Sequence, residues 1–172
     1  MSVNDLARTL PDYAKDIRLN VSSLLGETVL SDQQKYGTLV SCAHATGYKP
    51  LIEAAEAEAA DKLSEAAMTA AKAAASIMAM NNVYYRFVHL AANKEYSTLP
   101  ARLRMNVIGS PGIEKVDFEI FSLAVSAING CGMCIDAHEK VIRDHGVQTT
   151  VIHAAVRLAS VVQALAASLR AL

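Results

Sequence analysis

Helix start and stop signals recur along the whole chain, and no run of alternating β-branched residues interrupts them. Alanine-rich segments dominate, and alanine has the highest intrinsic helix propensity. Ser31 to Gln34 form a capping-box pattern, and Ser64 precedes a long alanine-rich run as a capping serine would. Glycines follow several apolar runs, where the left-handed conformation ends a helix. This pattern predicts an all-α fold.

The expected helices can be placed from these signals. They cover about residues 4–10, 11–24, 32–46, 50–58, 64–79, 84–90, 101–108, a run that ends at Asn129, 131–144, and 149 to the C-terminus. Asn81-Asn82 is expected to interrupt the fifth helix, residues 94–100 to form a loop, and Ser110-Pro111-Gly112 a turn. A chain of 172 residues with 52% hydrophobic residues can form one domain with a sizeable core.

An internal similarity divides the chain. At a shift of 85 residues without gaps, the coincident pairs include Asp32 with Asp117, Val40 with Val125, Gly47 with Gly132, and the caps Ser64 with Thr149. We interpret this as two diverged copies of one helical unit, at about 32–79 and 117–164, within a single domain of residues 1–172. Chance alignment of two alanine-rich helices is the alternative.

Four residues in the second copy suggest chemistry. Cys131 and Cys134 are separated by two residues at the start of a helix, where free N–H groups favour a thiolate. His138 lies one turn after Cys134 on the same helix face. Glu119 lies on the preceding helix and reaches His138 if the two helices pack antiparallel. The carboxylate would then orient the imidazole, and the imidazole would take the thiol proton.

Other interpretations of these residues stay open. A lone pair of cysteines at this spacing also occurs in zinc sites, and Cys131, Cys134, His138 and Glu119 could supply four ligands. Such a site would indicate a zinc-binding or scaffold protein. A single histidine or glutamate is more often structural than catalytic. The third cysteine, Cys42, is interpreted as a buried apolar thiol.

Composition excludes several classes of partner. The formal net charge is −1 and no basic patch stands out, so nucleic acid is not expected as a partner. Three cysteines form no framework, and the N-terminus lacks the apolar core of a signal peptide; both features favour the reducing cytoplasm. Polar residues interrupt the apolar C-terminal run, which argues against a membrane span. They are His153, Arg157, Gln163 and Arg170.

The chain resembles the alkyl hydroperoxidase D family of the carboxymuconolactone decarboxylase-like superfamily over essentially its whole length. The likeness rests on residues 10–16, on residues 77–86, on Arg104-Met105-Asn106, and on Glu119 followed by Ser126 to Cys131, Cys134 and His138. The resemblance implies an all-helical fold with an internal duplication, and a homotrimer. One departure is Met133, because family members often have a histidine just before the second cysteine.

The resemblance also implies a function. It implies a thiol peroxidase in which Cys134 attacks the hydroperoxide, Cys131 resolves the sulfenic acid to a disulfide, and Glu119 and His138 relay a proton. Dihydrolipoyl groups on an acyltransferase of a 2-oxo acid dehydrogenase complex would be the reducing co-substrate, with no bound cofactor or metal, and a peroxiredoxin could receive electrons. A non-redox decarboxylase-like enzyme that uses only Glu119 and His138 is the alternative within the superfamily.

Overall fold

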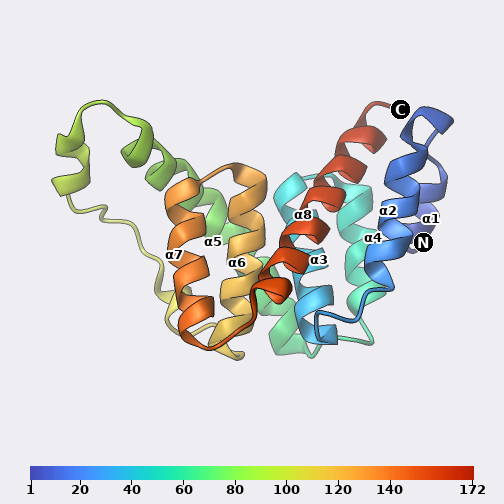
Figure 1. Ribbon diagram of the computed structural model, residues 1–172, viewed down its shortest axis with the longest axis horizontal. Coiled ribbons are helices and arrows are strands. Elements are labelled where there is room, and N and C mark those ends of the chain that lie inside the picture. Colours follow the sequence, from blue (N-terminus) through green and yellow to red (C-terminus); the bar gives the residue numbers. More distant parts are fainter.

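The computed structural model describes residues 1–172, and every regular element in it is helical (Figure 1). The elements are α1 (Val3–Arg8), η1 (Asp12–Ala14), α2 (Lys15–Leu25), α3 (Asp32–Thr46), α4 (Lys49–Ala59), α5 (Glu65–Leu90), η2 (Lys94–Thr98), η3 (Asn106–Ile108), α6 (Lys115–Asn129), α7 (Gly132–Asp144) and α8 (Thr149–Arg170), where η denotes a 3₁₀ helix. The predicted all-α fold is confirmed.

Helix ends follow the predicted capping chemistry. Ser31 and Gln34 form the capping box: the Ser31 hydroxyl accepts the Gln34 N–H, and the Gln34 side chain accepts the Ser31 N–H. Ser64 caps α5 in the same way through the N–H of Ala67. Gly47 and Gly130 end α3 and α6 with φ of 67° and 69°, a conformation that favours glycine.

Three local expectations between residues 81 and 108 were wrong. Helix α5 continues through Asn81 and Asn82 without interruption, because both side chains are buried and bonded or packed inside the molecule. Packing therefore overrides the low helix propensity of asparagine. Residues 94–98 form a 3₁₀ turn within the expected loop, and only residues 106–108 of the expected helix at 101–108 are helical. Arg102 has a φ of 51°, which a right-handed helix does not permit.

Helix α6 lies at the centre of the core, against α3, α5, α7 and α8. Its residues 117–126 are all buried. The approach of α3 to α6 is close: a Cβ added at Gly37 would lie 2.0 Å from the Phe121 ring, so only glycine fits there without movement. Helix α8 alone is long and apolar enough to cross a membrane, with a mean hydropathy of 1.5. Its buried side chains belong to the same core, as is usual for the core helix of a soluble domain.

The order α3–α4–α5 recurs as α6–α7–α8, and α3 and α6 both span 15 residues. The helix-ending glycines Gly47 and Gly130 are 83 residues apart, so the structural register differs from the gapless 85-residue shift. Thr149 is the first residue of α8, and Gln148 occupies the cap position without a side-chain hydrogen bond. The two-copy interpretation stays a prediction, now with the helix-end register.

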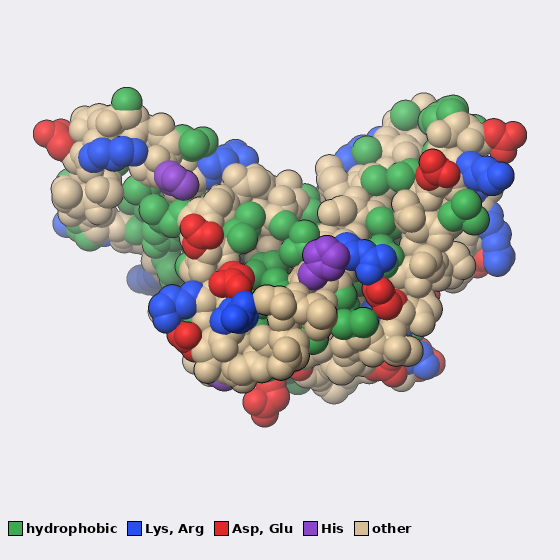
Figure 2. Space-filling model, viewed as in Figure 1, with side chains coloured by type: hydrophobic (Ala, Val, Ile, Leu, Met, Phe, Trp, Pro, Cys, Tyr) green, Lys and Arg blue, Asp and Glu red, His purple; other side chains and the backbone are tan.

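The C-terminal end of α5 projects from the helical body together with η2 and the segment that follows (Figure 1, left). We call residues 83–105 the arm. Large apolar side chains are exposed along it, at Val83, Phe87, Leu90, Tyr96 and Leu99, and hydrophobic groups are visible on this projection in Figure 2. The Phe87 and Tyr96 rings pack on one another with centroids 5.0 Å apart.

Candidate active site

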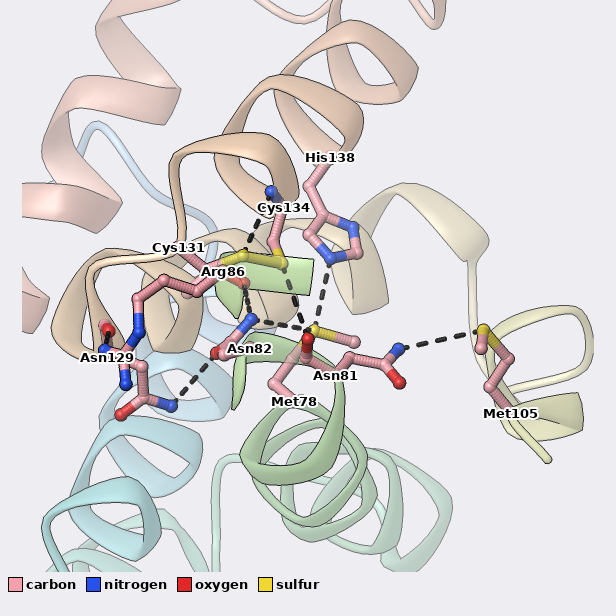
Figure 3. Close-up of a disulfide and its surroundings, with 10 residues drawn as sticks. Met78, Asn81, Asn82, Arg86, Met105, Asn129, Cys131, Cys134 and His138 are labelled. Atoms are coloured by element: carbon pink, nitrogen blue, oxygen red, sulfur yellow. Dashed lines mark hydrogen bonds between the residues drawn. A yellow bond between two sulfur atoms is a disulfide. The ribbon is translucent and has the colours of Figure 1, made fainter. Parts of the chain in front are cut away.

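The two cysteines of the second unit form a disulfide at the start of α7 (Figure 3). Gly130 reverses the chain after α6, and Cys131 becomes the N-cap residue of α7. The backbone N–H of Cys134 donates to Cys131 Sγ at 3.3 Å, and the N–H of Cys131 donates to the carbonyl of Ser126 at 3.1 Å. The predicted cysteine pair is therefore confirmed as a disulfide, with one sulfur at a helix N-terminus.

The two sulfurs differ in access. Cys131 is 0% exposed, whereas Cys134 is 5% exposed and lines a cavity of about 250 Å³. Most of the cavity wall is apolar, and it is formed by Met78, Asn81, Tyr85, Ile108, Met133, Cys134, Ala137 and His138. The backbone oxygen of Asn81 lies 3.9 Å from Cys134 Sγ across this space. A small organic molecule in the cavity would meet Cys134 first, with Cys131 behind it.

Glu119 and His138 meet as predicted. Glu119 Oε2 lies 2.6 Å from His138 Nδ1, which confirms that α6 and α7 pack antiparallel across the Gly130 turn. Both side chains are buried, at 3% and 8% exposed. A buried carboxylate needs a paired hydrogen-bond donor, so this contact fixes the histidine ring with Nδ1–H toward the carboxylate. The other ring nitrogen, Nε2, is thereby left to face the cavity.

The expected contact between His138 and Cys134 is absent in this disulfide form. His138 Nε2 instead lies 3.2 Å from the Met78 sulfur, on the facing helix α5. Cys134 and His138 still line the same cavity, one helical turn apart. The structure thus brings together Glu119 with His138 and Cys131 with Cys134, and leaves space between the two pairs.

Helix α5 supplies polar residues that sequence reasoning missed. Asn82 is fully partnered: its amide nitrogen donates to Ser126 Oγ at 2.9 Å, and its carbonyl accepts from the Asn129 side chain at 3.0 Å. Arg86 donates to the Asn129 carbonyl at 2.6 Å (Figure 3). This network braces the Gly130 turn that presents Cys131. The available signal was the pair of asparagines inside an otherwise apolar helix, since buried polar side chains need partners.

Known proteins share this chain and its motif. The family model "Carboxymuconolactone decarboxylase family" matches residues 94–172. Proteins named alkyl hydroperoxide reductase AhpD are similar over nearly the full length: one from Rhizorhabdus wittichii is 68% identical over 166 residues, covering 96% of each chain. One from Maricaulis maris is 60% identical over 171 residues and 99% of each chain. This chain belongs to the AhpD family. A further AhpD, from Hyphomonas neptunium, is 61% identical and covers 99% of this chain and 95% of its own.

The remaining cysteine of this AhpD-family chain lies apart from the site. Cys42 is free and fully buried in the core cluster, as predicted, and burial raises the pKa of its thiol to about 12. No group of three or more His, Cys, Asp or Glu side chains is arranged to hold a metal ion. The zinc-site interpretation of Cys131, Cys134 and His138 therefore gains no support from the geometry.

Alkylation should separate Cys42 from the pair. We expect iodoacetamide at pH 8 to modify Cys131 and Cys134 in the reduced native protein and to leave Cys42 unmodified, because a thiol with a raised pKa stays neutral at this pH and is closed to the reagent. Peptide mapping gives the result, with urea-unfolded protein as the control in which all three react. Modification of native Cys42, or a disulfide that includes it after peroxide treatment, would contradict the assignment.

Proposed function

We propose that the protein reduces organic hydroperoxides through a dithiol–disulfide cycle of Cys131 and Cys134. The observation that supports this most is the arrangement of the disulfide: Cys134 faces an apolar cavity, and Cys131 is bonded to it from the closed side. A cavity with apolar walls suits an alkyl hydroperoxide better than a charged substrate. The names of the AhpD relatives support the same activity.

The cycle starts from the dithiol. The Cys134 thiolate attacks the terminal oxygen of the hydroperoxide, the O–O bond breaks, and the alkoxide leaves as an alcohol after it takes a proton. Cys134 is then a sulfenic acid, and Cys131 attacks its sulfur to form the disulfide and release water. Cys131 is placed for this second step because it lies beside Cys134 and away from the cavity, where it meets no other electrophile.

Glu119 and His138 are proposed as the proton relay. Glu119 holds His138 so that Nε2 points to the cavity, where it can take the thiol proton and return it to the alkoxide. In the disulfide form Nε2 contacts Met78 instead. Transfer in the dithiol form then proceeds after rotation of Cys134 Sγ toward Nε2 or through one water in the cavity.

Dihydrolipoyl groups of an acyltransferase are proposed as the reductant. A thiol of this linear dithiol attacks Cys134 through the cavity, and Cys131 leaves as a thiolate that the Cys134 N–H and the helix N-terminus stabilise. The second lipoyl thiol then releases Cys134. Access to a single recessed sulfur favours a slender co-substrate over a rigid protein loop. Electron transfer to a peroxiredoxin is proposed on the family resemblance alone.

A non-redox enzyme of the same superfamily would use Glu119 and His138 without thiol chemistry. The disulfide in the wall of the same cavity disfavours this alternative, since such chemistry requires no cysteine pair. Turnover decides between the two.

We expect the purified protein to consume cumene hydroperoxide with dihydrolipoamide as the only reductant. Cys134→Ser should abolish turnover, because the attacking sulfur is lost. Cys131→Ser should stop the cycle after one equivalent, with a sulfenic acid at Cys134 that a dimedone probe traps. The measurements are peroxide consumption and mass spectrometry, and Cys42→Ala serves as the matched control that retains activity. A wild-type protein without turnover, or a fully active Cys134→Ser variant, would refute the proposal.

The relay predicts non-additive losses. Glu119→Gln and His138→Ala should each lower peroxide turnover by roughly 10- to 1,000-fold, the scale of lost general acid–base help. The double variant should lose little more than either single one, because the two residues act as one unit. Higher assay pH should restore part of the rate in all three, as solvent hydroxide replaces the base. Losses that multiply, with unchanged pH profiles, would show that the pair does not activate Cys134.

A homotrimer is also proposed. The exposed apolar side chains of the arm, among them Val83, Phe87 and Leu90, leave a surface that association would remove from water. The family resemblance supports three copies. Light scattering coupled to size exclusion should give three times the monomer mass of 18.3 kDa at micromolar concentration. Phe87→Glu on the arm should lower this mass, and a monomeric wild-type protein would exclude the assembly.

A further inference from the structure

One buried polar atom near the dithiol has no partner. The side-chain carbonyl oxygen of Asn81 accepts no hydrogen bond, although the residue is only 4% exposed. Its amide nitrogen makes one weak contact, with the Met105 sulfur at 3.8 Å. A buried carbonyl without a donor costs about 1–3 kcal/mol, so its presence in a folded protein requires a reason.

The neighbouring asparagine lacks this feature. Asn82 is 1% exposed, and both ends of its side-chain amide are bonded, to Ser126 and Asn129. The two residues are adjacent on α5 and equally buried, yet they face different surroundings. Asn82 faces the turn behind Cys131, whereas Asn81 lines the cavity that Cys134 and His138 share. Figure 3 shows the Asn81 side chain extending toward Met105, below the His138 ring in this view.

The cavity is otherwise poor in hydrogen-bond acceptors. Its walls are mainly apolar, and the polar side chains besides Asn81 are His138 and Tyr85. His138 donates Nδ1–H to Glu119 and holds its other nitrogen toward Met78. A hydroperoxide differs from an ether or an alkane by one O–H donor on its terminal oxygen. The unpartnered Asn81 carbonyl is the acceptor that such a donor lacks elsewhere in the cavity.

We propose that Asn81 positions the substrate: its side-chain carbonyl accepts the hydrogen bond of the hydroperoxide O–H. This inference rests on the proposed peroxidase function. The torsion that turns an asparagine amide is broad, so the carbonyl reaches the cavity at little cost. With the hydrogen directed to Asn81 on α5, the terminal oxygen is held in the space that Cys134 lines from α7, and the alkyl group lies against the apolar wall.

The same bond persists through the first chemical step. Cys134 gains the terminal oxygen together with its hydrogen, the O–O bond breaks, and the alkoxide takes a proton and leaves as an alcohol. The sulfur is oxidised by two electrons and the peroxide is reduced by two. The O–H that Asn81 held is now the O–H of the sulfenic acid, so Asn81 keeps that group oriented until Cys131 displaces it as water.

Two oxidants test this positioning role. The reduced protein is mixed with cumene hydroperoxide, which has an O–H, or with cystamine, a disulfide that has none at the reacting centre. Asn81→Leu should slow the reaction with the hydroperoxide by about 5- to 30-fold, the span expected for one lost hydrogen bond to a buried group. The reaction with cystamine should change by less than about twofold, because thiol attack on a disulfide does not use this acceptor.

Matched measurements separate positioning from structure. Asn82→Leu removes a partnered amide one residue away and should slow both oxidants by the same factor. Asn81→Leu should retain or raise the melting temperature, since it removes an unsatisfied carbonyl, and should leave the pH profile of the peroxide reaction unchanged, unlike Glu119→Gln. Asn81→Ala provides the same comparison with a smaller side chain if leucine disturbs the fold.

The outcomes are distinct. A wild-type dithiol that does not react with cumene hydroperoxide overturns the proposed function and this inference with it. A reactive wild type with an unchanged ratio of the two rates in Asn81→Leu and Asn81→Ala overturns the positioning role alone. A selective loss toward the hydroperoxide at unchanged stability supports it.

Discussion

The burial of α6 is the constraint on which the site depends. Four helices surround its residues 117–126, so no polar side chain on this stretch reaches solvent. A buried carboxylate is stable only when it is paired, and each of the two on α6 has partners from another helix. Asp117 accepts from the side chains of Gln33 and Gln34, and Glu119 pairs with His138. The need to satisfy Glu119 thus fixes the orientation of the histidine that faces the cavity.

The disulfide is held by a second constraint, the tight turn at Gly130. This turn makes Cys131 the N-cap of α7 and places its sulfur over the free N–H of Cys134. In the helix-end register of the first unit, Tyr48 occupies the same cap position on α4 and makes no side-chain capping bond. Two units with the same helix order therefore differ in one cap residue that can undergo thiol chemistry. The helical frame is shared, and the reactive group belongs to the second unit.

Helix α5 forms the opposite wall and shows how stability and chemistry are divided within one helix. Asn82 is satisfied and braces the turn, whereas Asn81 leaves a carbonyl unpaired at the cavity. A local violation of hydrogen-bond satisfaction at one position, beside a satisfied neighbour, is characteristic of a functional site rather than of general packing error. Met78 adds an apolar contact to His138 from the same helix, two residues closer to the core cluster.

The sequence by itself determined the helices, their caps and the short-range chemistry. The capping box at Ser31, the glycine stops and the spacing of Cys131, Cys134 and His138 depend on neighbours within a few residues, and these local features were predicted correctly. The Glu119–His138 contact could be anticipated because only one tight turn joins α6 to α7. The tertiary structure alone decided what α5 contributes, since Met78, Asn81 and Asn82 reach the dithiol from about 50 residues earlier in the chain. It also decided that α5 runs unbroken through two asparagines and that Cys134, and not Cys131, faces the cavity. Burial and long-range packing set these features, and neither leaves a local pattern in the sequence.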